Sequence, residues 1–272
     1  MIFELHAPAS PLNQFVELFT FYEGIAFSHS IERLFPEGVV EVIIDLTETP
    51  KFIYDNNALT EIQTCKTAWV SGVRKAFISI SVLPYSSMFV IRFRSGMAYP
   101  FLQIPIHELD GQVIDADLIF GNGFAEIREQ LLASPSPQAK FALMEKYLSE
   151  RSKTFLTIPP VVSFGIQQIL RNPTTTQINL LADKTGYSHK HFLSLFTKYV
   201  GLTPKQFLRV MKFQQTLQSI EQTLVPNWSQ LALDCGYYDQ AHFINDFRTF
   251  SGLTPNEYMI KKGEYFNYVP IQ

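Results

Sequence analysis

The sequence GLTPKQF, from Gly201 to Phe207, is followed 51 residues later by GLTPNEY, from Gly252 to Tyr258. The similarity extends backwards through residues 180–208 and 230–259, where the two segments first align at an offset of 50 that later becomes 51. One residue has therefore been inserted between two stretches that otherwise stay in phase. A repeat that keeps its helical positions aligned on both sides of an insertion indicates a duplicated structural unit.

Each copy is predicted to hold two helices joined by a tight turn. Gly186 and Gly236 suit the left-handed backbone that commonly follows a helix end, and Ser188 and Asp239 are placed to cap the second helix. This second helix carries apolar residues at the i, i+3, i+4, i+7 spacing of one buried face. They are Phe192, Leu195, Phe196 and Tyr199 in the first copy, and Phe243, Phe247 and Phe250 in the second, where Asp246 interrupts the stripe.

The repeated phrase marks the boundary between the second helix of each unit and the helix that follows. Its glycine ends one helix, and Thr203 or Thr254 caps the next, with proline in the first turn. Gln206 and Glu257, three residues later, complete a capping box. We interpret the phrase as the boundary between two helices and not as a binding site. Residues 205–222 are expected to form a long helix that holds the two units at a fixed spacing.

A short helix, a glycine-containing turn and an amphipathic second helix form a helix-turn-helix. Ordinary pairs of packed helices are commoner, but two tandem copies in a basic segment favour nucleic-acid binding. Residues 154–262 hold 10 Lys and Arg against 6 Asp and Glu, a net charge of +4, whereas residues 1–153 hold 12 against 18, a net charge of −6. This split predicts two domains with different tasks and a polyanionic partner for the second.

Residues 160–262 resemble the double helix-turn-helix domain of the AraC family of bacterial transcription regulators. Most of the likeness lies in GYYDQAHFINDFRTFSGLTPNEY, residues 236–258. The resemblance implies double-stranded DNA as the partner. It also implies that the second helix of each unit enters a major groove, in two successive grooves ~34 Å apart on one face of the DNA.

The resemblance and the predicted buried faces together select the residues that face DNA. Those expected to contact base edges are Lys190, Ser194, Gln240 and Asn245. Lysine suits guanine and the two amides suit adenine. Lys198 and Arg248 lie further along their helices and are expected to contact phosphates.

Two apolar residues on the same faces leave alternatives open. Leu193 and Ile244 either meet thymine methyl groups or pack against the neighbouring helix. Because these faces carry few long donors, we expect modest base reading and a larger contribution from phosphate contacts and DNA shape.

Residues 1–153 are predicted to be mainly β, with helices at their end. In FPEGVVEVIIDL, residues 35–46, apolar residues alternate with Glu41 and Asp45, which indicates a strand with one buried and one solvent-exposed face. Further strands are expected in TAWVSGV, AFISISVL and SMFVIRFRSG, and helices in FAEIREQLLAS and PQAKFALMEKYLSER, the second starting at Ser136 and Pro137. Short strands separated by Gly and Pro favour an antiparallel barrel or sandwich.

The predicted fold class is therefore α+β with two domains. A β-rich sensory or dimerisation domain with C-terminal helices covers residues 1–153, an all-α tandem helix-turn-helix domain covers 160–262, and a tail covers 263–272. KTFLTIPP ends the first part, and Pro159-Pro160 marks the boundary.

The front half also resembles the uncharacterised N-terminal domain of one AraC subgroup, in RLFPEGVVEVIIDL, in VIRFRSGMAYPFLQIPIHELDGQVIDADLIFG and in AEIREQLLASPSPQAKFALMEKYL. The resemblance implies a cupin-like barrel that binds a small-molecule effector, mediates homodimerisation, or both. Arg92 and Arg94 share one strand face, and either meet an anionic ligand inside the barrel or are solvated outside it.

The remaining chemistry-bearing residues favour neither a metal nor a redox role. Cys65 and Cys235 lack CxxC spacing and are expected to be reduced and buried. His189, His191 and His242 lack the spacing and partners of a metal site, so no cofactor is expected. Without a bilayer-length apolar run or a signal-peptide layout, the chain is expected to be cytoplasmic and to bind no membrane.

The function predicted from these features is that of a sequence-specific DNA-binding transcriptional regulator, controlled by a small molecule or by dimerisation through the front half. One alternative is a ligand-binding module whose helix-turn-helix pair is mainly structural, which the weakly basic recognition faces favour. A cupin-type enzyme is the third reading. A metal set, a nucleophile elbow and a phosphate loop are not found in the sequence, so the chain is not expected to be an enzyme.

Overall fold

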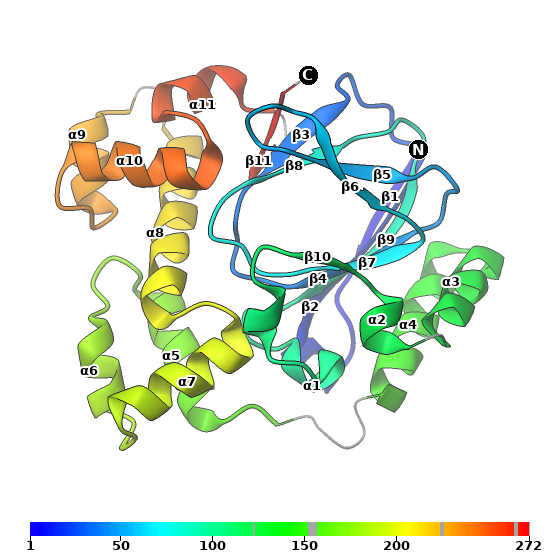
Figure 1. Cartoon of the computed structure of the whole chain (residues 1–272), viewed down its shortest axis with the longest axis horizontal. Helices are drawn as coiled ribbons and strands as arrows, with labels where there is room; N and C mark the ends of the chain where they lie inside the picture. Colours follow the sequence, from blue (N-terminus) through cyan, green and yellow to red (C-terminus); the bar gives the residue numbers. More distant parts are fainter. Residues whose placement is uncertain (122, 152–156, 224–225, 264–265, 272) are drawn as a thin grey trace.

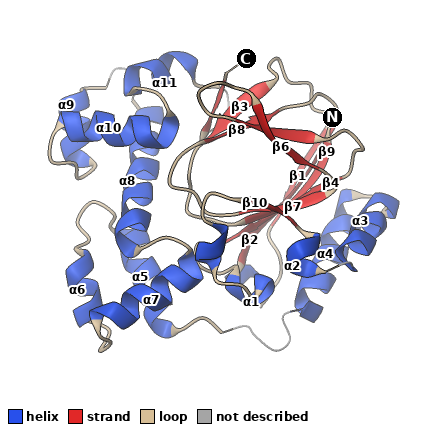
Figure 2. Ribbon diagram, viewed as in Figure 1, coloured by secondary structure: helices blue, strands red, loops and turns tan. Residues whose placement is uncertain are grey.

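The computed structural model of this 272-residue chain describes residues 1–121, 123–151, 157–223, 226–263 and 266–271. The front half forms two antiparallel β-sheets flanked by helices, and the back half is helical (Figures 1 and 2). This is the α+β organisation predicted from the sequence. The expected boundary between residues 153 and 160 lies partly outside the described residues, and helix α5 (Pro160–Arg171) begins directly after it.

Within the described residues, one sheet has six strands in the order β1-β2-β9-β4-β7-β10, and the other has five in the order β11-β3-β8-β5-β6. The strands are β1 (Ile2–His6), β2 (Val16–Glu23), β3 (Ile31–Leu34), β4 (Glu41–Asp45), β5 (Lys51–Tyr54), β6 (Glu61–Cys65), β7 (Ala68–Ser71), β8 (Ile78–Ser81), β9 (Ser87–Phe93), β10 (Val113–Asp115) and β11 (Tyr268–Pro270). Strands β4, β7, β8 and β9 lie in the four segments that the sequence predicts.

One face of β4 is buried as predicted, and the other differs from the prediction. Val42 and Ile44 are fully buried on the face that the helices cover; on the same face, the Phe89 ring of β9 lies 5.7 Å from the Phe141 ring of α4 (Pro137–Arg151). The other face, predicted to meet solvent, is turned towards the five-stranded sheet. Asp45 on that face is only 1% exposed, because the second sheet covers it.

Short helices and two longer ones complete the front half. They are η1 (Leu12–Gln14), α1 (Tyr99–Leu102), η2 (Ile106–Leu109), α2 (Asp117–Phe120), α3 (Gly123–Ala133) and α4. The predicted helices α3 and α4 are both confirmed. Ser136 Oγ accepts a hydrogen bond from the Ala139 amide at 3.2 Å, which confirms Ser136 at the start of α4.

The back half contains α5, α6 (Ile178–Asp183), α7 (His189–Val200), α8 (Pro204–Glu221), α9 (Trp228–Asp234), α10 (Gln240–Ser251) and α11 (Pro255–Lys261). Helices α7 and α10 are both 12 residues long and begin 51 residues apart, whereas α6 and α9 begin 50 apart. The inserted residue is Tyr238, which is 87% exposed in the turn between α9 and α10. Helix α8 runs between the two units (Figure 1).

The two halves share one hydrophobic core. Phe35, just after β3, has its ring 5.8 Å from both Phe213 of α8 and Tyr258 of α11, and the core cluster continues from the sheet through the helices. The chain then returns to the front half after α11. Strand β11 pairs with β3, with Val269 opposite Arg33 and fully buried. The sequence predicts only a tail here, because a three-residue strand carries no periodicity.

Candidate DNA-binding surface and front-half cavity

The recognition helices α7 and α10, the second helices of the two units, begin as the sequence predicts. Ser188 Oγ accepts from the His191 amide at 3.3 Å, and Asp239 Oδ1 accepts from the His242 amide at 2.7 Å. Gly186 and Gly236 have positive φ angles of +72° and +75° in the preceding turns. Both capping boxes of the repeated phrase are present. Each helix is thus held in place by local hydrogen bonds from its first turn.

Five of the six predicted DNA-contacting residues are exposed. These are Lys190 and Ser194 on α7 and Gln240, Asn245 and Arg248 on α10. The Ser229 hydroxyl of α9 donates to Gln240 Oε1 at 2.8 Å, which ties the first turn of the recognition helix to the preceding helix. The N-terminal ends of both recognition helices therefore present polar side chains to solvent.

Lys198 differs from the other five, because it lies against the front half. Its ammonium nitrogen is 4.8 Å from the centre of the Tyr99 ring of α1, and a hydrogen bond with the Tyr99 side chain raises the pKa of Lys198. The rings of Tyr99 and Tyr199 are 4.5 Å apart. The C-terminal end of α7 is thus docked, while its N-terminal end is free.

Leu193 and Ile244 are half-buried and pack against the main hydrophobic core. Of the two alternatives left open by the sequence, the structure favours packing on protein. This reduces the apolar surface available to thymine methyl groups on both faces.

The interruption at Asp246 has a specific partner that the sequence analysis missed. Asp246 is 5% exposed, and its carboxylate accepts from Arg209 of α8 at 2.6 and 3.3 Å. Lys212, one turn further along α8, donates to the Gly236 carbonyl at 2.9 Å. A buried acid on the apolar face of one helix and basic residues on the facing helix are the signal that points to such a pair.

The repeated phrase does more than mark the ends of helices, because its two glycines contact the front half. A methyl group added at Gly201 would collide with Val73 and would lie 2.8 Å from Ile106 Cγ2. One added at Gly252 would lie 2.6 Å from Arg33 Nη1 and 2.7 Å from Phe77. Equivalent positions of the repeat therefore touch the front half through their backbones.

Between the two sheets lies a cavity in two adjoining parts of ≈ 450 and ≈ 250 Å³ that share several wall residues. The larger part is also lined by Asn267 and Tyr268 of the C-terminal segment and by residues 35–39, next to α8. Much of the wall of the smaller part is apolar, with residues such as Ile43, Trp69, Ile80 and Val90. The hydrophobic cluster within this space is small, which leaves room between the sheets.

Arg92 lines this cavity, but it is neutralised by protein groups. Its guanidinium lies 2.7 Å from Glu37, 2.8 Å from Glu41 and 3.2 Å from Glu17. Burial lowers the pKa of Arg92, but the carboxylates outweigh that effect and raise the pKa overall. Arg94 is exposed and donates to the Asn13 carbonyl at 2.8 Å. Arg92 therefore faces the cavity between the sheets and Arg94 is exposed, so the two arginines do not form one anion site.

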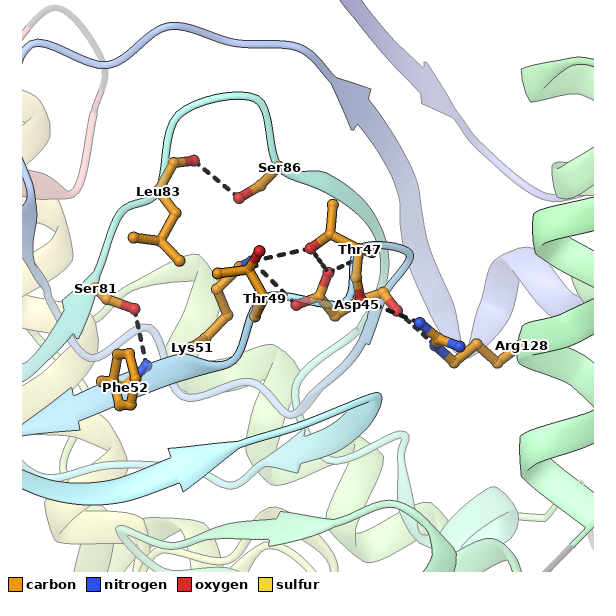
Figure 3. Close-up of polar contacts among 9 residues, drawn as sticks. All are labelled: Asp45, Thr47, Thr49, Lys51, Phe52, Ser81, Leu83, Ser86 and Arg128. Atoms are coloured by element: carbon orange, nitrogen blue, oxygen red, sulfur yellow. Dashed lines mark hydrogen bonds and ion pairs between the residues drawn. The ribbon is translucent and has the colours of Figure 1, made fainter.

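A second buried charge cluster is centred on Asp45 and Lys51 (Figure 3). Lys51 also belongs to the wall of the smaller part of the cavity. The Lys51 ammonium lies 3.1 Å from Asp45 Oδ2 and donates to Thr47 Oγ1 and to the Thr49 carbonyl. Arg128 of α3 donates to the carbonyls of Asp45 and Thr47 at 2.7 and 3.1 Å. The charge of Lys51 is thus paired within the protein, and the loop between β4 and β5 is fixed to α3.

The described residues contain no group of three or more His, Cys, Asp or Glu suited to a metal ion. Cys65 and Cys235 are both buried and free, and burial raises the pKa of the Cys65 thiol to about 11. In the described part of the chain, no helix is both long and apolar enough to cross a membrane.

Together, the fold and the exposed recognition helices define a two-domain protein in which a β-rich domain precedes a tandem helix-turn-helix. Residues 181–260 match the family described as "Helix-turn-helix domain", and residues 4–115 match "Domain of unknown function (DUF6597)". Residues 181–260 thus carry an AraC-type helix-turn-helix domain and residues 4–115 carry a DUF6597 domain, as the resemblance implied.

Curated relatives include an uncharacterized HTH-type transcriptional regulator of Haemophilus influenzae, 29% identical over 42% of this chain and 39% of the relative. The uncharacterized HTH-type transcriptional regulator YbfI of Bacillus subtilis is 27% identical over 43% of this chain and 44% of the relative. Each match thus spans about two fifths of the relative's length. A crystal structure of ToxT from Vibrio cholerae with an unsaturated fatty acid bound aligns with 91% of this chain and 96% of its own, at 11% identity and a TM-score of 0.47.

Proposed function

We propose that this chain is a sequence-specific DNA-binding transcription regulator whose activity is controlled through its front half. The observation that supports this most directly is that both recognition helices expose polar residues at their N-terminal ends. Lys190 and Ser194 on α7, and Gln240 and Asn245 on α10, are the proposed base-reading residues. The tandem units share helix α8, so a single rigid helix sets the distance between two groove contacts.

Arg248 and Lys198 are the proposed phosphate contacts. Arg248 is exposed near the end of α10, where a guanidinium suits the DNA backbone. Lys198 lies over Tyr99 in this structure, so it reaches a phosphate only where the docking at α1 opens. Arg248 therefore gives the cleaner test.

The cavity between the sheets is the proposed effector site. The larger part, ≈ 450 Å³, falls within the ~300–1,000 Å³ range of small-molecule pockets. A bound molecule would shift the protein between arrangements of the helix-turn-helix units only by binding one arrangement more tightly than another. Residues 35–39 belong both to the cavity wall and to the contact with α8, which supports a coupling of this kind.

The test is fluorescence anisotropy of the full chain with labelled DNA from upstream of its own gene, beside a scrambled duplex, at two salt concentrations. A regulator binds the upstream DNA more tightly, and its affinity falls steeply with salt because bound phosphates release counterions. Equal, weak and salt-insensitive binding to both duplexes would favour the alternative, a ligand-binding module whose helical pair is structural.

Arg248→Ala should weaken binding to both duplexes to the same extent and lower the salt slope by about 1. The matched control is Lys146→Ala, which removes an exposed charge from α4, outside the helix-turn-helix domain. A loss confined to one sequence would contradict the phosphate role of Arg248.

A further inference from the structure

The loop of residues 72–77, between β7 and β8, touches both helix-turn-helix units at equivalent positions of the repeat. Val73 packs on Gly201 in the first phrase, and Phe77 packs on Gly252 in the second. Ile106 of η2 and Arg33 of β3 complete these two contacts, and the Arg33 guanidinium lies 4.3 Å from the centre of the Phe77 ring. One short loop therefore contacts two glycines that are 51 residues apart in the chain.

Arg74 lies between these two contacts in the loop and lines both parts of the cavity. Its guanidinium contacts the Ser71 hydroxyl. Its buried Nε atom has no hydrogen-bond partner among the described residues. A buried donor without an acceptor is costly, so this atom indicates where an acceptor from outside the chain would be stabilised.

Among the described residues, three basic side chains line the two parts of the cavity, and Arg74 is the one without an ion pair. Lys51 is paired with Asp45, and Arg92 is paired with three carboxylates, so neither has a charge to spare for a ligand. Burial lowers the pKa of Arg74, while nearby Glu41 and Glu37 favour its charged form. Within the described residues, Arg74 is thus a buried cation that has no ion-pair partner.

The charges around Arg74 decide what kind of acceptor fits. Glu32, Glu37 and Glu41 line the larger part of the cavity with Arg74 and Arg92, so its acidic side chains outnumber its basic side chains. Burial raises the pKa of Glu32, which is 3.3 Å from His29. A ligand carboxylate brought against this wall would be repelled by Glu37 and Glu41. An uncharged oxygen would satisfy the Arg74 donor without that repulsion.

We infer that the cavity selects an uncharged, largely apolar small molecule with a carbonyl or ether oxygen, to which Arg74 donates a hydrogen bond. The 72–77 loop couples the binding of this molecule to the docking of both helix-turn-helix units. The inference rests on the proposed effector role of the cavity and adds to it the ligand class and the connection. With Arg74 fixed by a ligand, Val73 and Phe77 on either side are held against the two glycines. Ligand binding therefore strengthens the docking of both units on the front half.

The ligand class is tested by displacement of the neutral fluorescent probe N-phenyl-1-naphthylamine from the full chain. The competitors are 2-nonanone, nonanoate and nonylammonium, which share a chain length and differ in charge. We expect the ketone to displace the probe at the lowest concentration. Arg74→Met should weaken the ketone by about tenfold to a hundredfold, the effect of one hydrogen bond to a charged group, while still binding the probe. Stronger competition by nonanoate, or an unchanged ketone affinity in Arg74→Met, would overturn the assignment.

The connection is tested by hydrogen exchange of the intact chain with and without 2-nonanone, followed in peptides covering 200–208 and 251–259. We expect slower exchange in both peptides, because local opening of a docked segment becomes rarer. In Val73→Ala/Phe77→Ala the protection should remain around the cavity and disappear from both helical peptides. Lys75→Ala, an exposed residue of the same loop, is the matched control and should behave as the wild type.

Protection confined to the front half, or to one of the two units, would refute the two-sided connection. Neither experiment uses DNA. A failure here with selective DNA binding intact would reject the loop's role alone, and the reverse result would reject the DNA-binding proposal alone.

Discussion

The docking of the repeated phrase predicts that two glycines with the same backbone conformation respond differently to the same substitution. Gly186 and Gly252 both have φ of +72°, which disfavours any residue with a Cβ. A methyl group at Gly186 has no neighbouring atom within 4 Å, whereas one at Gly252 lies 2.6 Å from Arg33 Nη1 and 2.7 Å from Phe77. Gly186→Ala thus reports the conformational cost alone, and Gly252→Ala reports that cost together with the loss of docking.

The two contributions can be separated in magnitude. Placing alanine in the left-handed region costs ~1–2 kcal/mol, which is the full effect expected for Gly186→Ala. Gly252→Ala adds the cost of overpacking a filled contact, about 1–3 kcal/mol, because the Phe77 ring must move. The free energy of unfolding should therefore fall by ~2–5 kcal/mol in Gly252→Ala.

Thermal unfolding followed by circular dichroism measures the difference. One kcal/mol corresponds to roughly 2–4 °C for domains of 150–250 residues, so Gly252→Ala should melt at least about 2 °C below Gly186→Ala. Adding Phe77→Ala should recover part of the loss in Gly252→Ala, a non-additive effect expected for residues in contact. The same addition to Gly186→Ala should be additive. Equal melting temperatures for the two glycine variants would refute the docking role of the phrase.

Three further predictions concern single residues of the second unit and its contacts. The Thr254 amide and hydroxyl hold the pKa of Glu257 below its ordinary value of 4.5. The stability that this capping box adds is therefore present above that value and is lost as pH falls through the lowered pKa of Glu257. Glu257→Gln should remove this fall at acid pH from a plot of melting temperature against pH, because glutamine, as at Gln206 in the first unit, does not titrate. Arg209→Ala leaves Asp246 buried without its arginine partner. Because the Arg209 side chain is 43% exposed, we expect the free energy of unfolding in urea to fall by about 1–3 kcal/mol. The control Lys205→Ala, an exposed residue of the same helix, should leave it unchanged. Asn245→Ala should change the preference for one base pair by ~1–3 kcal/mol in binding to a panel of single-base operator variants, and an unaltered preference would remove it from the base-reading set.

The sequence predicted the helical half closely because its signals are local. The caps at Ser188, Asp239, Thr203 and Thr254 act over three residues, and each is found where the sequence places it. The change in offset between the copies likewise gave the inserted turn residue, because the helices on either side kept their 3.6-residue period. The strands β4, β7, β8 and β9 and the helices α3 and α4 followed from period and turn residues in the same way.

Tertiary structure alone decided what those elements face. Alternation in β4 showed that the strand has two different faces, but the tertiary structure covers both of them. Helices cover one face and the second sheet covers the other, so Asp45 is buried beside Lys51. The three-residue strand β11 formed only because β3 offered an open edge. The glycines of the repeated phrase were correctly assigned to helix ends, yet their contacts with Val73 and Phe77 join residues more than a hundred positions apart. Local hydrogen bonds and periodicity determine what a segment becomes, and they carry no information about the distant surface that closes over it.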